Sequence, residues 1–305
     1  MIPYTRKTLP NGLTVVVNRD RASKLAAVNI LYRVGARNEN PARTGFAHLF
    51  EHLMFRGTRT VENFDLPVQM ASGDNNAFTN NDYTDFYITL PKDNLETALW
   101  LESDRMEGLD ITPAKLEAEK KVVIEEFRQR YLNQPYGDQT MLLRALAYKV
   151  HPYRWAAIGL ATDHIAGATL ADVESFYRTH YRPSNAILSI SADMEEERML
   201  ELAEKWFAPL ADHPSATAAI PQEPMQTQAR RQEVERDVPA STVTVAYHMC
   251  ARTKPDFYTA DLVSDLLSGG DSGRLYTHLV KERNLLSSVN AYITGDVDPG
   301  LFVFT

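Results

Sequence analysis

Hydrophobic and polar residues alternate in short segments through the first third of the chain, a pattern typical of β-strands. Residues 4–9 and 13–18 alternate on either side of Asn11-Gly12, a dipeptide that favours a tight hairpin turn. Three further strands are expected, at residues 25–34, 76–80 and 84–90. The N-terminal part of the chain is therefore predicted to form a sheet that contains hairpins.

Between and after these segments, apolar residues recur every three to four positions, which is the period of an amphipathic helix. The clearest helix covers residues 93–108. Another begins at Thr112-Pro113, where proline at the first helical position is favourable, and continues to about Leu132. The remaining elements expected are helices at residues 45–55, 62–71, 138–149, 169–181 and 195–207 and a strand at 186–192.

Residues 213–232 differ in composition, because prolines, glutamines and small residues replace the periodic pattern. We interpret this segment as a linker between two domains, residues 1–212 and residues 233–305. After it the pattern restarts, with strands expected at 233–238, 242–249, 287–294 and 301–305 and helices at 256–268 and 273–283. Strands and helices do not alternate regularly, so we predict an α+β fold with largely antiparallel sheets.

The composition is that of an ordinary globular protein, with 44% hydrophobic and 24% charged residues among 305. The net charge of −8 argues against general binding to nucleic acid. No apolar run approaches the ~20 residues of a membrane span. Residues 1–7 lack the apolar core of a secretory signal, which leaves the compartment open between cytoplasm and periplasm. The single cysteine, Cys250, excludes an internal disulfide.

The strongest indication of chemistry is the segment His48-Leu49-Phe50-Glu51-His52, which reads H-x-x-E-H. On a helix, residues four apart lie on one face, so both imidazoles can point at one metal ion. Glu51 can then reach a water molecule at the open position of that metal and accept its proton. The flanking residues are mostly apolar, which predicts a largely buried helix, where polar groups without a partner are costly. A metal ion is the simplest partner.

Two histidines do not complete a catalytic zinc site, which normally takes three protein ligands and a water molecule. The best source of a third ligand is the acidic cluster on the helix that begins at Thr112-Pro113: Glu117, Glu119, Glu125 and Glu126. Glu119 and Glu126 are two helical turns apart and share a face. The spacing alone leaves both Glu125 and Glu126 open as the third ligand.

Six segments of the chain match, in the same order, the sequence motifs of one protein family. Three come first: residues 9–13 (L-x-N-G-L), 34–39 (V-G-x-R-x-E) and 45–58 (the helix G-x-A-H-x-x-E-H with F-x-G-T after it). The others are residues 76–79 (N-A-x-T), 119–126 (E-x-x-V-x-x-E-E) and 268–275 (a glycine turn). On these segments the chain resembles the pitrilysin-type (inverzincin) zinc metallopeptidases, in particular the half-length subunits similar to the mitochondrial processing peptidase. The resemblance implies two similar domains, each with a mainly antiparallel sheet packed by helices. The second would be only partial here.

The resemblance also implies roles for individual residues. Glu126 would be the third zinc ligand, beside His48 and His52. Glu51 would be the general base, and Glu119 would support the site by hydrogen bonding or charge. The resemblance further implies a substrate-binding strand edge at Asn76, Ala77 and Phe78, which would pair with an extended peptide.

We therefore expect a zinc-dependent endopeptidase that cuts short or unfolded peptides, with Glu51 activating the zinc-bound water. The resemblance also implies a homodimer or a heterodimer with a related subunit. The alternative is a non-catalytic scaffold or partner subunit of the same fold, but such subunits typically lose part of H-x-x-E-H, which is intact here. A zinc-containing binding module would need a fourth protein ligand, and the sequence near the motif offers no further cysteine or histidine.

Overall fold

The computed structural model of the chain describes residues 2–213 and 218–305. Their contacts group the chain into two compact units: one formed by Met1–Arg130 with His151–Gln222, the other by Tyr131–Val150 with Glu223–Thr305. Residues 131–150 thus pack with the C-terminal segment, although we expected them inside a first domain of residues 1–212. The domain boundaries stay a prediction, and residues 214–217 of the expected linker lie outside the described residues.

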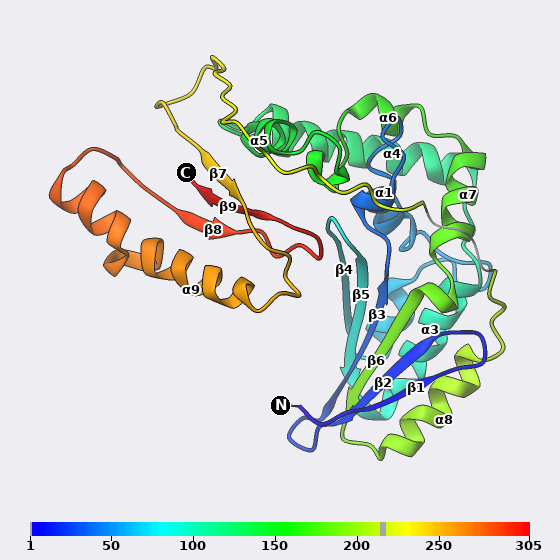
Figure 1. Cartoon of the computed structure of the whole chain (residues 1–305). Helices are drawn as coiled ribbons and strands as arrows, with labels where there is room; N and C mark the ends of the chain where they lie inside the picture. Colours follow the sequence, from blue (N-terminus) through cyan, green and yellow to red (C-terminus); the bar gives the residue numbers. More distant parts are fainter. Residues whose placement is uncertain (1, 214–217) are drawn as a thin grey trace. The chain divides into compact units, whose positions relative to one another are not determined.

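A six-stranded sheet forms the centre of the first unit, in the order β1-β2-β6-β3-β5-β4 (Figure 1). Its strands are β1 (Thr5–Thr8), β2 (Thr14–Arg19), β3 (Leu25–Tyr32), β4 (Asp74–Thr79), β5 (Thr84–Pro91) and β6 (Ala186–Ala192). All neighbouring strands are antiparallel except β2 and β6, which run parallel. The hairpin at Asn11-Gly12 is confirmed, with Gly12 at a positive φ of 89° that glycine adopts without strain.

Two long helices cover one face of this sheet. Helix α3 (Leu95–Glu107) packs on β3 and β5, and α8 (Glu196–Phe207) packs on β2 and on α3. Alternate residues of β3 are fully buried, as the period of two requires when one face of a strand is covered. The apolar stripe expected on residues 93–108 lies in this core, where Leu95, Ala98, Leu99 and Leu101 are buried.

Helix α1 (Phe46–Leu53) lies beside the β4 edge of the sheet and contacts β4 and β5. It is packed by α4 (Pro113–Phe127) and α7 (Leu170–His180). Smaller helices of this unit are α2 (Asp65–Met70) and α6 (Thr162–Ala166). The H-x-x-E-H segment is therefore helical, as predicted, and it lies where a sheet edge meets two helices.

The second unit contains a three-stranded antiparallel sheet, in the order β7-β9-β8. Its elements are β7 (Val245–His248), β8 (Ala291–Ile293), β9 (Leu301–Phe304), α5 (Gln139–Ala147) and α9 (Asp256–Ser268). The predicted helix at residues 273–283 is a π-helical turn at Tyr276–Glu282. Another π-helical turn, Arg128–Leu132, follows α4.

The strand predicted at residues 233–238 is wrong. These residues are extended without pairing to a strand, and nearly all of them are exposed. In a strand, Val234 and Val238 would share one face with Arg236, and acidic residues would fill the other. This alternation does not produce a strand here, because the small sheet of the second unit consists of β7, β9 and β8 and does not pair with the segment.

In the part of the chain that the structure describes, no helix combines the length and the apolar character needed to cross a membrane.

Candidate active site

Helix α1 carries His48, Glu51 and His52 among buried apolar residues. Its other side chains, including Phe46, Leu49 and Phe50, are almost completely inaccessible to solvent. His48 is also buried, whereas Glu51 and His52 are half-buried. The two imidazole rings lie 4.9 Å apart, edge to face, as expected for residues one turn apart on a helix.

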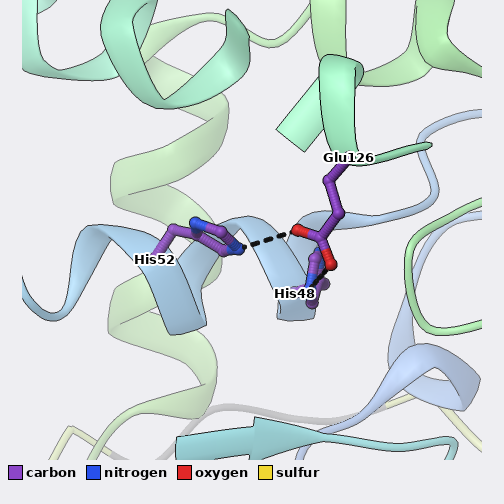
Figure 2. Close-up of side chains that lie close together, drawn as sticks. All are labelled: His48, His52 and Glu126. Carbon is purple, nitrogen blue, oxygen red and sulfur yellow. Dashed lines mark ion pairs between the residues drawn. The ribbon is translucent and has the colours of Figure 1, made fainter. Parts of the chain in front are cut away.

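The third side chain comes from α4. This helix is capped by Thr112, whose hydroxyl accepts the Lys115 N–H at 3.2 Å, with Pro113 at its first position. Glu126 lies on the face of α4 that meets α1, with its carboxylate between the two imidazoles (Figure 2). Glu126 Oε1 is 3.7 Å from His48 Nε2, and Oε2 is 3.3 Å from His52 Nε2.

Glu125 points elsewhere. Its carboxylate pairs with Arg128 at 3.5 Å, and its side chain is half exposed. The structure thus separates the two glutamates that spacing had left open, because it brings only Glu126 to the histidines. Their roles as ligand and non-ligand stay a prediction.

Glu119, two turns before Glu126 on α4, lies next to the imidazole of His52. It is 1% exposed, and its Oε2 is 3.5 Å from His52 Nδ1, on the far side of the ring from Glu126. Arg56 contacts its other oxygen at 2.5 Å. Glu119 thus lies behind the imidazole of His52, a position that carboxylates commonly take behind metal-binding histidines.

The pKa values of the two histidines shift in opposite directions. Burial alone would lower the pKa of His52, but Glu119 and Glu126 outweigh it and raise this pKa from 6.5 to about 9. Burial lowers the pKa of His48 to about 4, although Glu126 opposes this. In the metal-free protein, a proton on His52 thus supplies the positive charge that the two carboxylates require.

Glu51 lies next to this group without belonging to it. Burial raises the pKa of its carboxyl, while a hydrogen bond from Thr79 and the charge of His52 oppose that shift. Its Oε2 is buried and has no hydrogen-bond partner among the described residues. A buried acceptor without a partner is costly, and such groups are common where a substrate or solvent molecule must bind. The arrangement suits a proton acceptor.

Strand β4, which carries Thr79, is the edge strand of the sheet. Asn76 and Phe78 are exposed and Ala77 is half-buried, as the alternation along a strand requires. The Ala77 N–H donates to Asn76 Oδ1 at 2.8 Å, a side chain of its own strand. Strand β5 is the one strand of this sheet that pairs with β4, so the other edge of β4 has no neighbouring strand in the sheet.

The donor set fits zinc. Ligand atoms of His48, His52 and Glu126 all lie within 4.8 Å of one another, and these three form the one such group among the described residues. Two imidazole nitrogens and one carboxylate oxygen are a ligand set used by catalytic zinc sites, which keep a fourth position open. The buried carboxylate of Glu119 and the half-buried carboxylate of Glu126 favour a cation here, and the same two groups raise the pKa of His52.

Sequence reasoning missed three residues around this group. Arg130 contacts Glu126 at 3.0 Å, and its spacing of four residues along a helical turn was a signal. Arg56 contacts Glu119 from the segment after α1, and no sequence pattern indicated this pairing. Glu39 binds the start of α1, and its segment V-G-x-R-x-E entered the sequence analysis only as part of the family resemblance.

Two family models and several known proteins match the chain. Residues 14–156 match the family described as insulinase (peptidase family M16), and residues 167–305 match the peptidase M16 inactive domain. The chain is 34% identical to zinc protease PqqE of Helicobacter pylori, over 97% of this chain and 68% of that protein. It is 26% identical to a probable mitochondrial-processing peptidase subunit beta of Arabidopsis thaliana, over 98% of this chain and 59% of that protein.

Solved structures show the same fold. A protease from Helicobacter pylori superimposes with a TM-score of 0.91 and 32% identity, over 100% of this chain and 74% of that one. A peptidase M16 inactive domain from Pseudomonas fluorescens gives a TM-score of 0.85 at 20% identity, over 99% of this chain and 74% of that one. The chain thus spans about three fifths to three quarters of these proteins.

The histidine pair gives a first testable expectation. In the metal-free protein, the imidazole of His52 should titrate near pH 9 and that of His48 near pH 4. Because the folded-state pKa of His52 exceeds its ordinary value of 6.5, its proton stabilises the fold below about pH 6.5, and this contribution is lost as the pH rises through about 9. Nuclear magnetic resonance of isotope-labelled histidine measures both values.

The substitution E119Q should lower the pKa of His52, whereas E125Q should leave it unchanged. A wild-type His52 that titrates at or below pH 6.5 would show that the carboxylates do not hold a proton on this ring.

Proposed function

The chain belongs to the M16 peptidase family of insulinase- and pitrilysin-like proteins, and from this premise we propose that it is a zinc-dependent endopeptidase that hydrolyses short or unfolded peptides. The observation that carries the proposal is the convergence of His48, His52 and Glu126 beside the buried carboxyl of Glu51. The zinc protease names of several relatives support zinc as the metal.

His48, His52 and Glu126 would hold the metal, and Glu119 would keep His52 oriented with Nε2 toward it. Zinc, when bound, would supply a Lewis acid that polarises a substrate carbonyl and acidifies a water molecule. Glu51 would accept the proton of the attacking water and pass it to the amine that leaves. Its raised pKa suits both steps, because a general acid–base group works best with a pKa near the working pH.

Strand β4 supports a peptide as the substrate. An extended peptide that paired with its free edge would form main-chain hydrogen bonds with little demand on side-chain sequence. Asn76, Ala77 and Phe78 would then bind the substrate close to Glu51, since Thr79 of the same strand hydrogen-bonds that carboxyl. The likeness to a processing-peptidase beta subunit supports a second copy or a related chain as partner, which the mass of the purified particle in solution would reveal.

The intact site favours the peptidase over a non-catalytic scaffold of the same fold. A scaffold has no need to keep a buried acceptor such as Glu51 Oε2 without a partner. Cleavage of a mixed peptide library by zinc-loaded protein, with no cleavage after chelation, is the experiment that separates the two. Turnover by protein shown to be metal-free would exclude the mechanism proposed above.

The metal ligands are tested by comparing neighbouring glutamates. E126Q removes a carboxylate 3.3 Å from His52 and should weaken zinc binding by more than the roughly 10- to 100-fold typical of an outer hydrogen-bond partner. E125Q, which changes an exposed ion pair one residue earlier, should leave zinc binding unchanged. Zinc affinity is measured by competition with a chromogenic chelator. Full affinity in E126Q together with loss in E125Q would move the ligand to Glu125.

The general base is tested by E51Q, which preserves shape but cannot accept the proton. We expect wild-type zinc affinity and a kcat about 10²- to 10⁴-fold lower. Steady-state kinetics with a quenched fluorescent peptide and metal analysis of the same sample provide both readouts. A variant that retains zinc and cleaves at the wild-type rate would remove Glu51 from the mechanism.

Edge pairing is tested on the substrate, without altering the protein. A methyl group on a peptide nitrogen that faces β4 removes one hydrogen bond, which should lower kcat/KM about 2- to 10-fold at that position. A series of peptides methylated at successive nitrogens should show this effect at alternate positions near the scissile bond, since alternate N–H groups of a strand face one neighbour. The same methyl groups far from the scissile bond serve as controls, and a flat response would rule out strand pairing.

A further inference from the structure

The first turn of α1 has an unusual beginning. Gly45 precedes the helix with a φ of 91°, in the left-handed region, and offers no side chain to cap it. The usual solution is a Ser, Thr, Asp or Asn at this position. A Cβ on residue 45 would lie 2.6 Å from the carbonyl oxygen of Ile158, so only glycine fits at this position. The N–H groups of the first turn must therefore find acceptors elsewhere in the fold.

Glu39 provides those acceptors. Its Oε2 accepts the Gly45 N–H at 2.8 Å, and its Oε1 accepts the Ala47 N–H at 2.9 Å. The N–H of Phe46 also interacts with this carboxyl. A left-handed residue followed by helical residues turns successive N–H groups toward one point, which makes a concave site for an anion. The carboxyl of Glu39 fills that site.

Burying this carboxyl is expensive. Glu39 is 6% exposed, and burial raises its pKa to about 8 although the Ala47 and Gly45 amides oppose the shift. An uncharged side chain could fill the same volume at lower cost. The hydrogen bonds that it accepts from the Gly45 and Ala47 amides at the helix terminus offset this cost.

The segment before the helix is fixed from a second direction. Thr44 accepts the Leu160 N–H at 2.7 Å on its hydroxyl, and its own N–H donates to His164 Nδ1 at 3.1 Å. A Cβ on Gly159 would lie 3.0 Å from the Thr44 carbonyl oxygen. These contacts hold residues 44 and 45, but they leave the N–H groups within the helix to Glu39.

His48 depends on this first turn. Helix α1 has only eight residues, and helices below roughly 12–15 residues are marginal without tertiary support. His48 is its third residue and follows Ala47 directly, whereas His52 lies in the last turn, next to the buried Leu53. Fraying of the first turn would therefore displace the His48 imidazole while leaving His52 in place.

We propose that Glu39 is a positioning residue for the metal centre, which holds the first turn of α1 in its metal-binding geometry before the metal arrives. The inference rests on the zinc site proposed above. It adds a residue that touches neither metal nor substrate and that acts on His48 through the backbone of Gly45 and Ala47.

The test compares E39Q with a matched change at another helix start. E39Q keeps the shape of the side chain but turns a donor toward one of the two amides. T169A removes the hydroxyl that caps the start of α7 and accepts the Asp172 N–H at 3.3 Å. We expect E39Q to bind zinc about 10- to 100-fold more weakly and to change the visible spectrum of the cobalt(II)-substituted protein. T169A should lower the thermal unfolding temperature without either effect.

The outcomes separate this inference from the proposed function. Wild-type protein that binds no zinc would overturn both. Wild-type zinc affinity and an unchanged cobalt spectrum in E39Q would overturn the inference and leave the peptidase proposal standing. Should E39Q fail to fold, amide hydrogen exchange of metal-free wild-type protein decides: slow exchange at Gly45 and Ala47 supports the role of Glu39, and exchange at the rate of an unprotected amide overturns it.

Discussion

Two acidic side chains of α4 face the imidazoles of α1, and this pairing of opposite charges organises the region around it. Glu119 is almost completely buried, and Glu126 lies between His48 and His52. Buried carboxylates require a positive partner, because the loss of hydration costs several kcal/mol per ion. The protein meets this requirement with Arg56, with Arg130 and with the proton of His52, whose pKa rises to about 9. A divalent cation can take over from that proton.

The same charges explain why α1 and α4 must be held so firmly by other parts of the fold. The proposed metal centre of three side chains would tolerate little displacement, and its candidate ligands come from helices that are far apart in the sequence. Apolar residues on the other faces of α1 pack against α7, where Phe50 stacks on Phe176 with ring centroids 5.4 Å apart. Glu39 secures the opposite end of the helix. Packing and hydrogen bonding thus fix the site from separate directions.

The candidate metal ligands come from helices, and the sheet places an edge strand beside them. Strand β4 is an edge strand, and natural proteins usually protect such edges from pairing with other chains. Here the edge lies beside α1, and Thr79 at its end contacts Glu51. A peptide added to the sheet at this edge would run past the proposed base. In the proposed function, this edge would bind the main chain of a peptide with little demand on its side chains.

Much of this was predictable from sequence where local rules suffice. The period of the helix placed His48, Glu51 and His52 on one side of a segment with apolar flanks, and residues 186–192 and 256–268 are a strand and a helix as predicted. Local rules failed at residues 233–238, because alternation alone cannot tell whether a neighbouring strand is present. They also gave no sign that residues 131–150 pack with the C-terminal segment.

Sequence alone places two histidines and a glutamate on one helical face, since the 3.6-residue period depends only on the backbone. Adjacent glutamates differ by about 100° around a helix, so the choice between Glu125 and Glu126 depends on where α1 lies against α4. That position is set by packing between segments distant in the chain. The tertiary structure alone decided it, and it likewise brought Glu39 to the start of α1 and Arg56 to Glu119.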